Sequence, residues 1–278
     1  QLFVDSYTRL TAMRLFAHRA RDYMRSASAE DRRYLLFNPM VKMKVTTQGE
    51  EVVNMLWDVM AAKGFEKDMY FENAVIDIRA LPKLEGTVHV NMALIVKFMA
   101  NYFFKPAKFE DIPVRRDGEN DDFLFKQGPT KGLGKTRFHD YSLAYDKCKL
   151  ANVGVFKKQI AIFKKMLMLA SPNKQQIKDI DFLLIVGELF TLVAYGQLIL
   201  ESWDKNEIDD DLIDQIFDFM VRDFSKYALQ LYSKTSSTRA QQVFCQLMIS
   251  KPKKDTRRFD RILNEFAYAK KDSYTMNP

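Results

Sequence analysis

The chain has 278 residues, of which 47% are apolar, with only 10 Gly and 8 Pro, which fits a folded helical protein with one or two cores. Cys148 and Cys245 lie far apart, without a Cys-x-x-Cys motif or clustered His. This argues against a zinc site and a disulfide scaffold, so we expect no metal and a cytoplasmic location. The formal charge of +7 permits an acidic partner but selects none.

The first part of the chain has the pattern of four helices. Apolar residues recur at helical spacing in the first helix, and Asn38 as the cap and Pro39 in the first turn mark the start of the second. The fourth is apolar on most sides, so it should be central. We predict an all-α fold that opens with an antiparallel four-helix bundle, residues 1–104. The helices are predicted at about residues 4–27, 39–64, 71–79 and 87–103.

A linker is predicted over residues 105–149, because Pro, Gly and a polar run are concentrated in its first thirty residues. A connection of this length is usually functional or mobile. Residues 128–136 resemble a phosphate-binding loop, but five residues rather than four separate Gly128 from Gly134, and no strong strand precedes them. We interpret them as part of a flexible linker.

Residues 150–278 are predicted to form a second helical bundle. Residues 182–200 are apolar enough to suggest a membrane span, but Glu188 and Gln197 lie within them. We therefore interpret this segment as a buried bundle helix and expect no membrane association. The lysines at 157, 158, 164 and 165 are interpreted as a solvated face. Helices are predicted at about residues 150–170, 176–203, 209–234, 237–250 and 255–270.

The most informative residue is Glu85, which stands before Gly86 and Thr87 at the start of the apolar fourth helix. Gly86 allows close backbone approach, and Thr87 can present a helix-start hydroxyl and amides to an anion. A carboxylate at this position is well placed to face a ligand. The alternative interpretation of Glu85 is an exposed loop glutamate, which the helix dipole would favour.

With its surroundings, this motif resembles the C-terminal helical domain of flavin-dependent acyl-CoA dehydrogenases. The resemblance covers residues 4–103 and rests on the spacing, on Gly64-Phe65, on Asp77 and on the Glu85 motif. The family's usual Gln, two Gly and Arg are replaced. The replacements are Asp58, Ala61, Ala62 and Ile76.

The resemblance implies roles for six residues. Glu85 would be the base that removes the α-proton of the thioester, and Gly86 would belong to the cofactor-binding residues. Thr87 and His89 would approach the adenine-side phosphates and ribose of FAD. Asp58 and Ala62 would border the flavin pyrophosphate of a neighbouring subunit, where a carboxylate is repulsive. Capping for Thr87, and packing or surface exposure for His89, are the alternative roles.

The implied function is the α,β-dehydrogenation of acyl-CoA to trans-2-enoyl-CoA, with FAD as hydride acceptor and an electron-transfer flavoprotein as carrier. A homo-oligomer, dimer or tetramer, is implied as well. The sequence opens on Gln1 in mid-pattern, so we expect the C-terminal part of a longer enzyme, inactive alone. The run from Gly187 to Leu192 resembles the C-terminal helical region that longer bacterial family members append. Acyl-chain specificity, and oxidase against dehydrogenase, stay open.

Two other functions belong to different classes. The first is a non-catalytic helical scaffold or subunit derived from the same fold, motivated by the replacements at the family's cofactor positions. The second is a nucleic-acid-binding module, prompted by the positive charge. The chain lacks basic–aromatic interleaving and a recognisable helix-turn-helix, so we expect no nucleic-acid partner.

Overall fold

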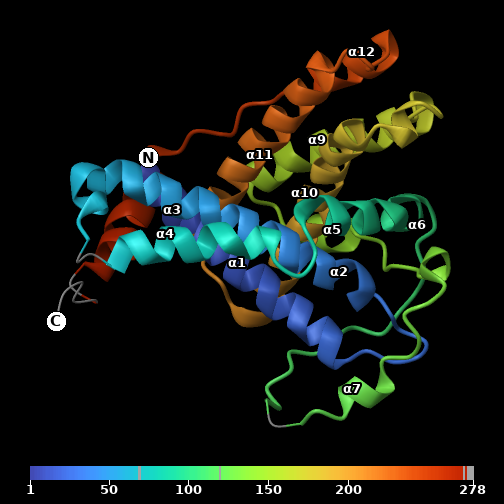
Figure 1. The fold of residues 1–278 in the computed structure, drawn as a ribbon, viewed down its shortest axis with the longest axis horizontal. Coiled ribbons are helices and arrows are strands. Elements are labelled where there is room, and N and C mark those ends of the chain that lie inside the picture. The colour runs from blue at the N-terminus through green and yellow to red at the C-terminus, as the bar shows by residue number, and fades with distance from the viewer. Residues whose placement is uncertain (68–69, 119, 272, 274–278) are drawn as a thin grey trace.

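The computed structural model describes all residues except 68–69, 119, 272 and 274–278 (Figure 1). Every regular element in this described part is helical, and its β contact is one isolated bridge between Pro106 and Phe138. The predicted all-α class is confirmed. The long helices contain no Pro and few Gly, and their backbone groups are satisfied within each helix, which explains this outcome.

Helix α1 (Leu2–Arg25) agrees with the prediction, but the second helix begins earlier than expected. Helix α2 (Tyr34–Met40) contains Pro39 in its interior, so the predicted cap at Asn38 is wrong. A proline inside a helix removes an N–H donor and crowds the preceding turn. The chain accommodates this by widening into a π-helical turn, Val41–Val45, before α3 (Thr46–Met60).

Helix α4 (Tyr70–Ala80) packs on α3 and leads through a 3-10 turn, Leu81–Lys83, toward α5 (Val88–Ile95). A second 3-10 turn, Val96–Phe98, joins α5 to α6 (Met99–Phe104). These bounds confirm the predicted third and fourth helices. Helix α5 lies between α2 and α10, so one neighbour comes before it in the chain and the other comes about ninety residues after it (Figure 1).

The segment after α6 contains α7 (Phe123–Lys126), a 3-10 turn (Leu133–Lys135) and α8 (Ser142–Lys147). Arginines near the end of α1 and before α2 donate to its backbone carbonyls. The Arg32 Nη1 atom donates to the carbonyls of Pro129 and Lys131 at 2.6 and 2.8 Å. Arg25 donates to the carbonyl of Asp117. The segment is therefore fastened to the first helices.

Among the described residues after 150, five α-helices confirm the predicted helical segments. Helix α10 passes the length and hydropathy test for a membrane span, but 78% of its most apolar window is buried within the protein. It lies against α1, α5 and α11. The helices are α9 (Ala151–Leu169), α10 (Ile180–Asn206), α11 (Asp210–Ser233), α12 (Arg239–Met248) and α13 (Thr256–Arg261), followed by helical turns Ile262–Ala267 and Tyr268–Lys270.

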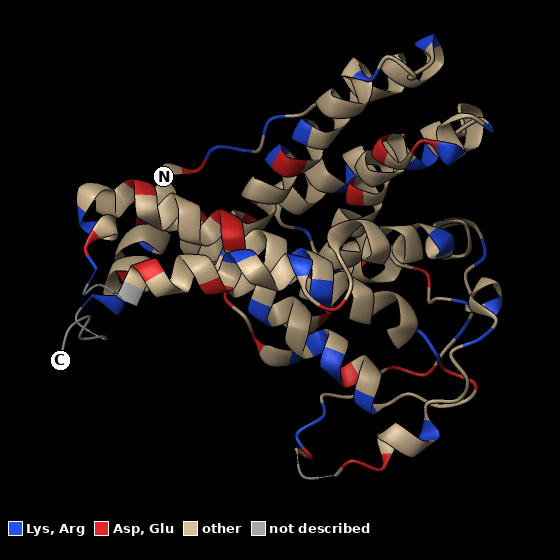
Figure 2. Cartoon of the chain, viewed as in Figure 1, with Lys and Arg blue, Asp and Glu red and all other residues tan. Residues whose placement is uncertain are grey.

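One hydrophobic core runs through both halves of the chain. It contains Phe16 of α1, Ile95 of α5 and Phe138 of the connecting segment, together with Phe190 and Phe217 from α10 and α11. The predicted division into residues 1–104, 105–149 and 150–278 stays a prediction. Acidic and basic residues are interspersed along most elements (Figure 2). In this view the net positive charge is therefore not gathered on one element.

Candidate active site

Glu85 lies in the sharp turn between the 3-10 turn Leu81–Lys83 and α5. Its φ angle is +45° and that of Gly86 is +99°, so two consecutive residues have left-handed backbone. Left-handed φ is costly for a residue with a β-carbon and free for glycine. The turn therefore explains Gly86, whereas Glu85 adopts a strained backbone and presents an exposed carboxylate just ahead of α5.

The turn is closed by a side chain that the sequence analysis did not consider. The amide Nδ2 of Asn91 donates to the carbonyls of Gly86 and Thr87, at 2.9 and 3.1 Å. The only sequence signal is an amide side chain one helical turn after the cap, in an otherwise apolar helix. Asn91 therefore fixes the backbone on which Glu85 is carried.

Thr87 is the N-cap of α5, as expected, and its Oγ1 accepts a weak hydrogen bond from the Val90 amide at 3.5 Å. The first helical bond of α5 runs from the Asn91 amide to the Thr87 carbonyl, so the Val88 and His89 amides precede it. A helix start of this kind favours an anion. His89 is exposed beside these amides. This end of α5 therefore fits a phosphate group.

Exposed apolar side chains occur on the segments that precede and follow Glu85 in the sequence. Leu84 and Val90 are 56% and 62% exposed, and Ile76 on α4 is 62% exposed. A general base for a weakly acidic C–H needs a dry environment. A ligand or a further protein surface that covers these side chains would provide one.

Asp58 and Ala62 lie far from Glu85 within one chain. They flank the end of α3, and the eleven-residue helix α4 separates them from the Glu85 turn. At 1.5 Å per residue, α4 spans about 16 Å. Both side chains are exposed, so they are accessible to another subunit. The structure thus keeps Glu85, Gly86, Thr87 and His89 together and leaves Asp58 and Ala62 apart.

The end of α3 fits a pyrophosphate poorly. Asp58 presents an exposed carboxylate, and Ala61 has a φ of +53° where glycine would be unstrained. Gly64 has a packing role, because a β-carbon there would lie 2.6 Å from Cδ1 of Trp57. These features favour neither an anion nor close cofactor approach.

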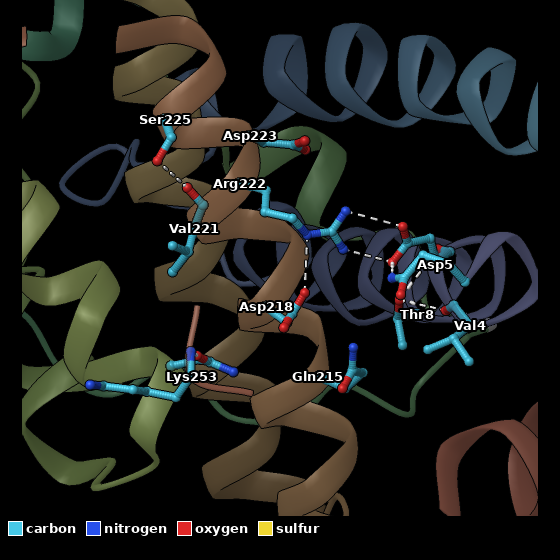
Figure 3. A network of polar contacts seen from close by, with 12 residues as sticks. Val4, Asp5, Thr8, Gln215, Asp218, Val221, Arg222, Asp223, Ser225 and Lys253 are labelled. Carbon is cyan, nitrogen blue, oxygen red and sulfur yellow. Dashed lines mark hydrogen bonds and ion pairs between the residues drawn. The ribbon is translucent and has the colours of Figure 1, made fainter. Parts of the chain in front are cut away.

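A second polar centre lies away from this turn, where α1 meets α11. Arg222 of α11 donates to Asp5 of α1 at 2.7 and 3.1 Å and to Asp218 at 3.0 Å (Figure 3). Arg9 forms a bidentate pair with Asp223 at 2.7 and 2.8 Å. These side chains satisfy one another, which indicates a structural role. Within the described residues, no group of His, Cys, Asp and Glu is arranged to hold a metal ion.

Comparison with known proteins identifies a family for the first part of the chain. Residues 1–100 match the family described as acyl-CoA dehydrogenase, C-terminal domain. The matched part contains α1 to α5 and all six candidate residues. No curated protein and no solved structure matches the chain. Residues 1–100 are therefore an acyl-CoA dehydrogenase C-terminal domain, and the helices that follow belong to no assigned family.

Proposed function

We propose that this chain is the C-terminal part of a flavin-dependent acyl-CoA dehydrogenase, with Glu85 as its base. The Glu85 carboxylate would take the α-proton of the acyl-CoA thioester, and the β-hydride would need an acceptor. The product is trans-2-enoyl-CoA. FAD, when bound, supplies the two-electron acceptor, and an electron-transfer flavoprotein then removes the electrons.

One observation carries the proposal: within the matched domain, Glu85 projects from a left-handed turn directly before α5. That turn presents the carboxylate outward next to helix-start donors, so one short segment can hold a base and an anionic group together. The exposed apolar side chains of Leu84, Val90 and Ile76 suit contact with an acyl chain or a flavin.

Two separate segments of the chain would contact the cofactor. The first turn of α5, with Thr87 and His89, would hold a phosphate or the ribose of FAD. Asp58 and Ala62 would face the pyrophosphate held by a neighbouring subunit of a dimer or tetramer. Since Asp58 repels a pyrophosphate, we propose weaker cofactor binding than a Gln would give. A cytoplasmic enzyme fits the free thiols of Cys148 and Cys245.

The test uses the intact polypeptide that carries this chain, loaded with FAD. Acyl-CoA is added without oxygen, and the flavin absorbance is followed. We expect bleaching by the wild type and a loss of at least about 1,000-fold in its rate for Glu85→Gln, which retains shape but accepts no proton. Glu72→Gln, at an exposed site on α4, is the matched control. Equal bleaching by Glu85→Gln would contradict the proposal.

A non-catalytic scaffold derived from the same domain is the second candidate. The exposed carboxylate of Asp58 favours it, because this group opposes a bound pyrophosphate. A protein that folds and assembles normally but retains no flavin would support the scaffold. Recovery of flavin binding in Asp58→Gln would identify the cause.

A further inference from the structure

The Glu85 helix receives much of its packing from the half of the chain that has no assigned family. Helix α5 contacts α2 on one side and α10 on the other. Its two fully buried side chains are Met92 and Ile95. Helix α10 begins at Ile180, about eighty residues beyond the matched domain. A tertiary contact therefore joins the two parts at the helix that follows the candidate base.

The contact depends on a glycine. A β-carbon at Gly187 would overlap Sδ of Met92 and would lie 2.9 Å from its Cγ and 3.0 Å from Cγ1 of Val96. Separations this short are below ordinary van der Waals contact. The absence of a side chain at Gly187 lets α10 approach α5 closely, and Met92 fills the space.

Helix α5 has little rigidity of its own. It has eight residues, its cap bond is long at 3.5 Å, and a 3-10 turn interrupts it at Val96. Short helices are marginal unless tertiary packing supports them. Met92 lies five residues after the N-cap Thr87, little more than one helical turn, so a shift at Met92 moves the start of α5 and the turn attached to it.

We infer that α10 is part of the machinery that positions the base: Gly187 and Met92 are positioning residues for Glu85. Its catalytic consequence rests on the proposed function. The packing role of α10, which holds α5 and the Glu85 turn in place, does not depend on catalysis. The C-terminal helices would then have a role in positioning Glu85.

The experiment compares three variants of the intact protein. Gly187→Ala introduces the overlap, and Gly187→Ala with Met92→Ala removes the opposing side chain. Gly154→Ala is the matched control, because a β-carbon at that helical position meets nothing within 4 Å. Amide hydrogen exchange of peptides covering residues 84–95 is measured, together with the rate of flavin bleaching and acyl-CoA affinity.

For Gly187→Ala we expect roughly 10-fold faster exchange in residues 84–95 and a 10- to 100-fold slower bleaching rate, with acyl-CoA affinity little changed. The double variant should recover both, and the control should change neither. Should Gly187→Ala fail to fold, Met92→Ala alone is expected to accelerate the same exchange. Unchanged exchange in folded Gly187→Ala or in Met92→Ala, or an equal effect of Gly154→Ala, would overturn the inference. A wild type that never bleaches refutes only the proposed function, since the exchange measurement still decides the packing role.

Discussion

Glu188, next to Gly187 on α10, is a carboxylate with an incomplete set of partners. Its Oε2 atom is buried and has no hydrogen-bond partner among the described residues. Burial raises the pKa of Glu188, although the charge of Lys44 opposes the shift. Tyr227 also opposes the shift by hydrogen bonding, but desolvation outweighs both groups, so burial of the charged form of Glu188 is only partly compensated.

Glu188→Gln should stabilise the protein at neutral pH and above. Because the folded-state pKa is raised, Glu188 is protonated in both states below its ordinary pKa of 4.5 and costs no stability there. The loss of stability accumulates as pH rises from 4.5 through the folded-state pKa and is complete above it. We expect a gain on the order of 1 kcal/mol near pH 7.5 that fades toward pH 4. Thermal unfolding of Glu188→Gln, wild type and the exposed control Glu72→Gln across this pH range is the measurement. If the gain in stability of Glu188→Gln over the wild type is no larger at pH 7.5 than at pH 4, the prediction is wrong.

At the scale of elements, the long segment after α6 was predicted as a linker, and its attachment could not be read from the sequence. Its backbone carbonyls accept hydrogen bonds from Arg25 and Arg32, and Asn101 donates to the carbonyls of Gly134 and Thr136 at 2.8 and 2.9 Å. The segment has few backbone partners of its own, so side chains of earlier helices supply them.

Arg32→Ala should loosen this segment locally. The variant loses two hydrogen bonds from a charged donor to Pro129 and Lys131, about 1–3 kcal/mol of local stability. We expect amide exchange in residues 125–135 to rise on the order of 10-fold, while global unfolding changes little. Arg14→Ala, at an exposed arginine on α1, is the control. If both variants exchange alike, Arg32 does not fasten the segment.

At the scale of the whole molecule, charged pairs join the acyl-CoA dehydrogenase domain to the C-terminal helices. Arg9 on α1 and Asp223 on α11 are 9% and 13% exposed, and Glu51 lies 3.2 Å from Arg9. Burial opposes ionisation of Asp223, but the hydrogen bonds and charge of Arg9 outweigh it and lower the pKa of Asp223. Figure 3 shows the neighbouring pair of Arg222 and Asp5, which bridges the same two helices.

Breaking the Arg9–Asp223 pair from one side should be costly. We expect Arg9→Met to lose about 3–5 kcal/mol of unfolding free energy, because Asp223 is left buried without its partner. The double variant Arg9→Met with Asp223→Leu should lose clearly less than the sum of the single changes. Denaturant unfolding of this double-mutant cycle provides the values. Lys126→Met, which removes an exposed pair with Asp122, is the control, expected within about 0.5 kcal/mol of wild type.

The same pair gives a pH dependence. Since the folded-state pKa of Asp223 is lowered, the stability from this pair is present above the unfolded carboxylate pKa and is lost as pH falls through the folded-state value. The double variant should therefore lose less stability on acidification than the wild type. The pair does not couple the two halves if the stability losses of the two single variants add up to that of the double variant. The same holds if the double variant and the wild type lose equal stability on acidification.

The sequence by itself determined the helices, the all-α class and the family of residues 1–100. Helical periodicity and caps are local properties, and the Glu85-Gly86-Thr87 motif lies within one turn. The error at Asn38 has a local cause too, because a proline that usually opens a helix is here absorbed by a π-helical turn.

Only the tertiary structure decided which helices meet. The approach of α10 to α5 at Gly187 and the pairing of Arg9 on α1 with Asp223 on α11 both depend on relative positions in space. Periodicity shows that a helix has a buried face but not which partner covers it. That choice is made by packing between residues far apart in the chain, where close approach and ion pairing outweigh local preference.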